Sequence, residues 1–306
     1  MKVEEIFKEI FAKCTDGVIL ADYETKQFIN GNAVIYKMLG VSKEEFDSLK
    51  AMDIYPKDDL PFILKELEKQ ASGDIVLAER IPVLRKDGTI IYTDIKTTFI
   101  TIDGKTYMVD IYRDITERKK AEELLLRQLQ MQAKIKVILE LSLQPMSLSD
   151  LLNGILDIIL SIPYLALESQ GCIFLVNDDY SKLELIVQRN FSQELMNHCT
   201  NVPFGYCLCG KAATTKKVVF KDCVDDLHDY FYLGMPQHGH FIVPIISGNN
   251  LLGVLNLYVK EGHKWEKWEE NFLLSVANTI AGIIERKNIE EQLRQYTNNN
   301  DNVNEH

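Results

Sequence analysis

Six cysteine and histidine side chains gather in one short stretch of this sequence, between positions 207 and 240. They are Cys207, Cys209, Cys223, His228, His238 and His240. Thiolates and imidazoles are the side chains that bind zinc, iron and iron–sulfur centres. The spacing lacks the paired C-x-x-C knuckles of structural zinc sites. A structural interpretation therefore stays open, in which the cysteines are small buried hydrophobes and the histidines are loop residues.

Local patterns favour four of the six as ligands. His238 and His240 are separated by one residue, just before the run FIVPI. If the pair is extended, both rings therefore point to one face. Cys209 should begin a helix, where backbone N–H groups lower the pKa of a thiol and favour the thiolate. The predicted centre is a transition metal, a haem or an iron–sulfur cluster. Its predicted ligands are Cys209, Cys223, His238 and His240, with Cys207 and His228 as substitutes.

The elements that must position these residues form the second half of the chain, residues 145–290. SLSDLLNGILDIILSIP predicts an amphipathic helix capped by Ser147. Strands are expected at GCIFLVND, LELIVQR, VVF, FIVPII and LLGVLNLYV, and a closing helix from about Trp265. The segments VPFGYCLCGKAATTKKVVF, GHFIVPIISGNNLLGVLNLYV and FLLSVANTIAGIIERK resemble a GAF domain. That resemblance implies a sheet that holds a ligand between one face and inserted helices.

The same resemblance raises an enzymatic alternative. Free methionine sulfoxide reductases are similar to GAF domains, and their Gly-x-Gly-x-Cys-Gly segment resembles Gly205 to Gly210, with Cys209 at the cysteine. The nucleophilic cysteine of that family precedes the central Val-Pro-Ile strand, where this chain has LGMPQHGHF and no cysteine. The Asn-Lys-x-Phe-Asp-Glu signature linked to cyclic nucleotide binding is missing too. The comparison favours a domain that is not an enzyme.

Residues 1–118 alternate between short strand-like runs and polar turns. GVILAD and KQFIN are followed by helical patterns, and then by the strand patterns DIVLAERIPVLR, TIIYTDIKTTFI and KTYMVDIYRDI. This order predicts a five-stranded antiparallel sheet with helices between its second and third strands. The segments DGVILAD, NAVIYKMLGVSKEEF, RKDGTIIY and YRDITERKKAEELL resemble a PAS domain with its C-terminal motif.

Cofactor chemistry is constrained in this first half. The first histidine of the chain is His198, which excludes a histidine-ligated haem here. The Asn-Cys-Arg-Phe-Leu run of light-sensing relatives is absent, and Cys14 is expected to be a packing residue. We expect a structural or dimerising role, with a small organic ligand in an apolar pocket as the alternative.

The linker, residues 119–144, has no Gly or Pro and is rich in Glu, Leu, Lys and Gln, which predicts one long helix. Two apolar seams run along it, Leu125, Leu129, Leu139 and Leu143 on one and Leu124, Met131, Ile135 and Ile138 on the other. A split stripe suits a parallel helical pair with weakly specified register, so we expect a homodimer. The alternative is a single helix packed on its own domain.

The overall composition limits the partners. The 45 acidic residues outnumber the 34 basic ones, giving a net charge of -11, which argues against a nucleic-acid partner. No stretch approaches the roughly 18 consecutive apolar residues of a membrane helix. Six cysteines are too few for a disulfide scaffold, so reduced thiols and a cytoplasmic location are expected.

Together these patterns predict an α+β protein with two sensor domains, 1–118 and 145–290, a coiled-coil-like linker, and a helix end with a disordered Asn-rich tail over 291–306. Signatures of a histidine kinase, of GGDEF-like or EAL-like enzymes and of a P-loop are absent from the sequence. We expect a non-catalytic sensor, or a fragment of such a sensor. It would signal through dimeric helices to a separate effector, such as a histidine kinase or a response regulator. A purely structural dimerisation module is the alternative.

Overall fold

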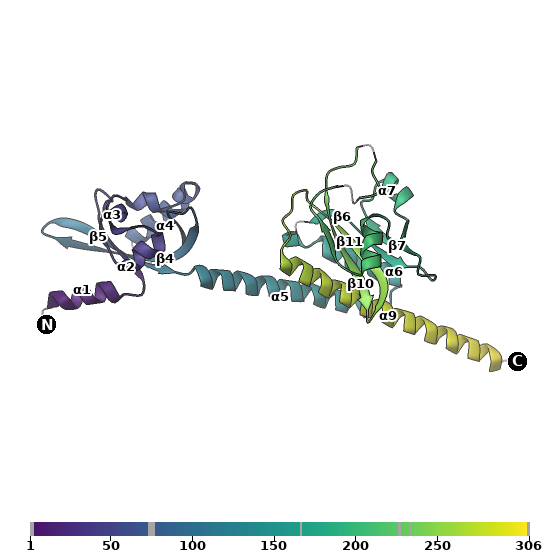
Figure 1. Ribbon diagram of the computed structural model, residues 1–306. Helices are drawn as coiled ribbons and strands as arrows, with labels where there is room; N and C mark the ends of the chain where they lie inside the picture. Colours follow the sequence, from purple (N-terminus) through teal and green to yellow (C-terminus); the bar gives the residue numbers. More distant parts are fainter. Residues whose placement is uncertain (1–2, 73–76, 166, 226–227, 233, 305–306) are drawn as a thin grey trace. The chain divides into compact units, whose positions relative to one another are not determined.

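The computed structural model describes residues 3–72, 77–165, 167–225, 228–232 and 234–304 (Figure 1). The chain divides into two compact units, Met1–Arg127 (unit 1) and Gln128–His306 (unit 2). Each contains one antiparallel sheet flanked by helices, which confirms the α+β class predicted from the sequence. Within the described ranges, no helix combines the length and the apolar character needed to cross a membrane.

Unit 1 is built on a five-stranded sheet in the order β2-β1-β5-β4-β3. Its strands are β1 (Gly17–Asp22), β2 (Phe28–Gly31), β3 (Ala78–Leu84), β4 (Ile90–Ile102) and β5 (Lys105–Asp114). The helical segments between β2 and β3 are α2 (Ala33–Leu39), α3 (Lys43–Phe46), η1 (Ala51–Ile54), η2 (Lys57–Asp59) and α4 (Leu60–Ser72), while α1 (Val3–Lys13) precedes the sheet. The prediction of helices inserted between the second and third strands is confirmed.

Local sequence signals explain where these helices begin. Ser42 accepts a hydrogen bond from the backbone N–H of Glu45, and the Glu45 side chain accepts one from the N–H of Ser42, so the two residues form a capping box. Asn32 caps α2 in the same manner through the N–H of Ile35. The helices cover one face of the sheet, over a core that includes Ile19, Ile35, Phe46, Ile63 and Ile95.

Unit 2 is built on a six-stranded sheet in the order β8-β7-β6-β11-β10-β9. Its strands are β6 (Leu167–Val176), β7 (Lys182–Arg189), β8 (Asn201–Pro203), β9 (Val219–Lys221), β10 (Gly239–Ser247) and β11 (Asn250–Val259). Its helices are α6 (Leu148–Leu160), η3 (Pro163–Leu165), α7 (Gln193–His198), α8 (Cys207–Thr215) and α9 (Lys267–Asn304). Helices α6 and α9 pack on one face of the sheet, and α8 packs on the other.

Strand alternation in β10 separates two cores. Phe241, Val243 and Ile245 point toward α6 and α9 and belong to the larger core of unit 2. Ile242 points the other way and packs with α8. Because side chains alternate along a strand, His240 shares the α8 face with Ile242. The sheet therefore places the predicted histidine ligand under the inserted helix.

The two seams of α5 (Thr116–Ser142) differ in burial. Ile138 is buried, and Met131 and Ile135 pack with it against the larger core of unit 2. The other seam remains exposed, at 57%, 54%, 48% and 73% for Leu125, Leu129, Leu139 and Leu143. One seam thus packs into the core of unit 2 except at Leu124, which is 52% exposed, while the other has no core to cover it among the described residues.

Helix α9 extends to Asn304, whereas the sequence predicts a disordered Asn-rich tail within residues 291–306. Extending an existing helix costs little free energy, because each added residue gains a hydrogen bond without a new nucleation step. The composition of the tail therefore did not end the helix. Residues 305–306 lie outside the described ranges.

Candidate metal centre

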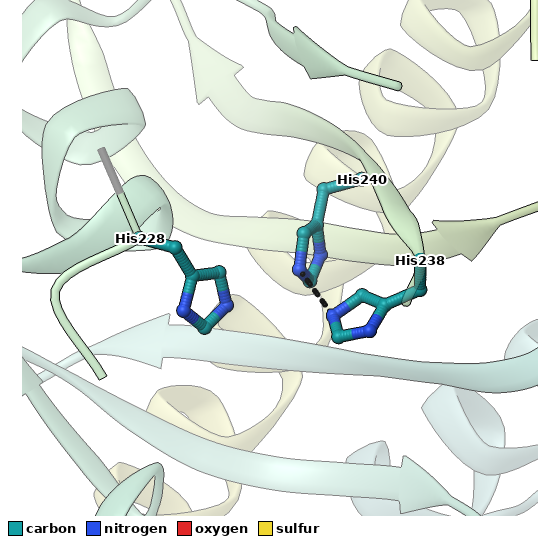
Figure 2. Close-up of side chains that lie close together, drawn as sticks. All are labelled: His228, His238 and His240. Carbon is teal, nitrogen blue, oxygen red and sulfur yellow. Dashed lines mark hydrogen bonds between the residues drawn. The ribbon is translucent and has the colours of Figure 1, made fainter. Parts of the chain in front are cut away.

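Three histidine rings meet at the α8 face of unit 2, and we call them the three-histidine cluster: His228, His238 and His240 (Figure 2). All three side chains are buried, and one ligand atom from each lies within 4.8 Å of those of the other two. The Nε2 atoms of His238 and His240 are 3.0 Å apart. Nitrogen ligands on a tetrahedral metal ion lie roughly 3.4 Å from one another. The His238–His240 pair is already close to that spacing.

The backbone explains why His238 and His240 share a face. They flank Gly239, the first residue of β10, so strand alternation turns both rings to the same side. A Cβ atom at Gly239 would lie 2.4 Å from the carbonyl oxygen of Lys221 in β9. Only glycine permits this close approach of β10 to its neighbour. The sequence prediction of two rings on one face is therefore met by the structure.

Each ring has its Nδ1 atom fixed by an oxygen. His240 Nδ1 lies 3.0 Å from Asn256 Oδ1, His238 Nδ1 lies 2.7 Å from the carbonyl oxygen of Pro236, and His228 Nδ1 lies 2.6 Å from that of Tyr230. The carbonyl oxygens of Pro236 and Tyr230 can only accept, so Nδ1 of His238 and of His228 carries the proton and Nε2 keeps its lone pair, whereas the Asn256 amide can pair with either tautomer of His240. The form with the proton on Nδ1 is the tautomer that metal-binding histidines use, with the oxygen partner holding the ring in place.

The electrostatic environment keeps the rings neutral. Burial, together with the neighbouring His238, lowers the pKa of His240 to about 3. Burial also lowers the pKa values of His228 and His238. The Nε2 atoms of His238 and His240 lie at hydrogen-bond distance, so one of them can donate a proton to the other (Figure 2). A cation that displaced this proton would bind both nitrogens.

The predicted cysteines do not join this cluster. Within the described residues, the three histidines are the one group of three or more His, Cys, Asp or Glu ligand atoms so close together. Cys207 and Cys209 line a small cavity with His228 and His240, whereas Cys223, after β9, does not line it. His228, predicted as a substitute, takes the third place in the cluster. Cys209 and Cys223, predicted as ligands, lie outside it.

The prediction that the start of α8 lowers the thiol pKa of Cys209 is wrong. Burial raises that pKa well above its usual value, and the nearby thiols of Cys172, Cys207 and Cys199 raise it further. Burial likewise raises the pKa of Cys207, against the opposing effect of nearby backbone N–H groups. Desolvation outweighs the helix N-terminus because the Cys209 side chain is 8% exposed and packs between α8 and the sheet. Neither thiol is a ready nucleophile at neutral pH.

The loop that carries His228 is tied to the start of α8. Asp229 accepts a hydrogen bond of 2.6 Å from the backbone N–H of Cys207 and forms an ion pair of 2.9 Å with Lys211. Cys207 has a φ of 50°, an unusual value for a residue other than glycine, and such strain is held only where surrounding contacts enforce it. A shift of His228 would therefore move Asp229 and, through its two contacts, the start of α8.

Two supporting residues escaped the sequence prediction. Asn256 lies in β11 and orients His240, and Tyr258, two residues on, packs against the rings of His238 and His240 at centroid distances of 4.8 Å and 4.4 Å. Asn256 had a visible signal, since it is a polar residue inside the apolar run LLGVLNLYV. Tyr258 had none that distinguished it from other strand aromatics.

Comparisons with known proteins agree with these two units. The family profile of the PAS fold matches residues 28–111, and that of the GAF domain matches residues 145–285. The methyl sulfide methyltransferase-associated sensor of Methanosarcina acetivorans is 25% identical over 315 residues, covering 96% of this chain and 30% of that relative. The chain therefore spans about 30% of the length of the curated relative it matches.

Solved structures of single domains are similar to each unit. The GAF domain of a phosphoenolpyruvate-protein phosphotransferase from Acinetobacter is 18% identical with a TM-score of 0.45, covering 53% of this chain and 95% of that one. A PAS domain from a two-component sensor histidine kinase is 17% identical with a TM-score of 0.32, covering 37% of this chain and 99% of that one.

Proposed function

We propose that this chain, in which a PAS domain is followed by a GAF domain, is a non-catalytic sensor whose GAF domain binds a transition-metal ion at the three-histidine cluster. The observation that carries the proposal is that the Nε2 atoms of His238 and His240 face each other at 3.0 Å in a buried site. Three neutral imidazoles suit zinc, copper, nickel, cobalt or iron. The oxygen partners on each Nδ1 prepare the rings for such an ion.

The size of the cavity favours a bare ion. The cavity beside the cluster has a volume of about 30 Å³, which matches one water molecule or an ion and does not hold a porphyrin. Its lining is largely apolar and aromatic, with Phe174, Phe191 and Tyr206 among the residues next to His240. That lining is the one feature that favours a haem, which would need the His228 loop to move outward. An iron–sulfur cluster is disfavoured, because it needs several close thiolates.

The reductase alternative is weakened by the same geometry. A thiol-based reductase needs an activated thiolate, and burial raises the thiol pKa of both Cys207 and Cys209. We therefore propose that the cavity senses a ligand or a redox state and does not turn over a substrate.

Signalling is proposed to pass from the cluster to the dimer helices. A metal that draws His228 toward His240 would pull on Asp229, and so on Cys207 and Lys211 of α8. The exposed seam of α5 and the exposed Ile289 and Leu293 of α9 are the surfaces proposed to form a parallel homodimer. A separate effector, such as a histidine kinase or a response regulator, would read the arrangement of these helices.

The test is the metal content and absorption spectrum of the full chain purified without oxygen. We expect about one transition-metal ion per chain in the wild type. The double variant His238→Ala with His240→Ala should lose it, because both facing Nε2 ligands are removed. His263→Gln is the matched control, since His263 bonds to Glu269 and is not a member of the three-histidine cluster.

The absorption spectrum distinguishes haem iron from a bare iron ion. A porphyrin absorption band that disappears in the double variant would favour haem over a bare ion. Wild-type protein with neither stoichiometric metal nor a chromophore, even after incubation with zinc or iron salts, would refute the proposal.

A further inference from the structure

A second cavity lies in the PAS domain, between the helices and the sheet. Its volume is about 280 Å³, comparable with about nine water molecules. The walls are mostly apolar and aromatic, and they include Met52 and Tyr55 from the η1 region, Leu64 and Leu67 from α4, and Phe99, Met108 and Tyr112 from the sheet. A space of this size and lining suits a small organic molecule.

One charged group lines this cavity from the middle of the sheet. Asp110 belongs to β5, the central strand, where it pairs with Ile19 of β1 and Thr97 of β4. Its side chain is 5% exposed. A carboxylate buried in apolar surroundings is costly unless it is paired and hydrogen-bonded.

The groups around Asp110 provide only part of the hydrogen bonding that its carboxylate can accept. The Thr97 hydroxyl donates a hydrogen bond of 2.7 Å to Asp110 Oδ1, and among the described residues this is the one hydrogen bond that the carboxylate receives. The hydroxyls of Tyr55 and Tyr112 lie nearby in the lining but bond to each other at 3.1 Å. Lys26, the cation in the lining, stands over the ring of Tyr23 at 4.0 Å and forms no hydrogen bond to the carboxylate within the described residues. Glu68 adds a second negative charge to the lining.

We propose that the PAS domain binds a small organic amine in this cavity, with its ammonium group donating to Asp110 and its apolar body packed against the aromatic and aliphatic walls. An ammonium supplies both the charge and the hydrogen bonds that the buried carboxylate lacks. Tyr55, Tyr112 and Phe99 present aromatic rings to the same cavity, and rings attract cations. The pKa of Asp110 is raised mainly by burial, which outweighs the opposing effects of the Thr97 hydrogen bond and of the Lys26 charge.

The test uses three probes that share a phenylethyl group and differ in the polar group, on the full chain: 2-phenylethylamine, 2-phenylethanol and 3-phenylpropanoate. Binding is measured by isothermal titration calorimetry at neutral pH. We expect the amine to bind with a Kd below about 1 mM and at least about tenfold more tightly than the alcohol, since a hydrogen bond to a charged group is worth at least that factor. The carboxylate probe should bind most weakly, because it meets Asp110 and Glu68.

Two variants test the residue and the space separately. Asp110→Asn should reduce the affinity for the amine to that for the alcohol, while Asp103→Asn, in the exposed β4–β5 turn, should leave it unchanged. Leu67→Phe should weaken the binding of every probe by filling the cavity from α4. The proposal is overturned if no probe binds, if the amine and the alcohol bind equally, or if Asp110→Asn binds the amine as tightly as the wild type does.

Discussion

Replacing Asp110 by Asn should stabilise the PAS domain at neutral pH. Burial raises the pKa of this carboxyl from 3.8 to about 6, so the folded domain disfavours the charged form. At about 1.4 kcal/mol per pKa unit, this shift lowers the free energy of unfolding at pH 7 by about 3 kcal/mol. Asn removes the charge, keeps the shape and still accepts the hydrogen bond from Thr97. We therefore expect Asp110→Asn to recover up to about 3 kcal/mol at pH 7.

The sign of the pH dependence makes this prediction specific. Between pH 3.8 and about 6 the folded state binds more protons than the unfolded state, so the wild-type stability contributed by Asp110 rises as the pH falls. The advantage of Asp110→Asn should thus be largest at pH 7 and disappear below about pH 4.

Amide hydrogen exchange of β5 measures the free energy of unfolding for the PAS domain alone, without assuming that the whole chain unfolds in one step. Asp103→Asn is the matched control and should change nothing at any pH. If Asp110→Asn is less stable than the wild type at pH 7, or if its effect does not depend on pH, the carboxylate has a native partner and the reasoning fails.

Three further outcomes can be measured on the full chain. Gly239→Ala should destabilise the GAF domain by about 1–3 kcal/mol in thermal unfolding, because its Cβ would meet the carbonyl oxygen of Lys221, while Gly282→Ala, with open space around it, should not. Leu139→Glu should give a monomer in light scattering at micromolar concentration, whereas Gln130→Glu, on the opposite side of α5, should not; a wild type that is itself monomeric would contradict the dimer. Metal-free protein should gain about 2.7 kcal/mol of GAF-domain stability when the free ion reaches about 100 times its Kd, and a chelator should reverse the gain.

The fold was accessible from sequence because its signals are local. Turns and alternation predicted the succession of strands and helices along the PAS domain, and the alternation rule alone placed His238 and His240 on one face. Ser42 and Glu45 formed the capping box that their spacing predicts. Each of these depends on residues a few positions apart, so the chain itself defines the geometry.

The site was less accessible because its remaining members depend on tertiary placement. His228 reaches the cluster from a loop, and no local pattern tells how far a loop folds over a sheet. Cys209 was placed correctly at the start of a helix, but its burial against the sheet reversed the expected pKa shift. Cys223 was chosen for its residue type, and the path of the chain after β9 leaves it outside the cluster.

Both domains place a polar residue on the face of a central strand that lies under the inserted helices. Asp110 does so in β5 and Asn256 in β11, and both are buried beside a cavity. Asp110 offers a carboxylate oxygen among aromatic rings, which suits an organic cation. Asn256 instead fixes a ring nitrogen, which suits a metal ion. Because the two sets of donors differ and each lies within its own unit, the two proposed signals are chemically independent, so Asp110→Asn should leave the metal content of the GAF domain unchanged.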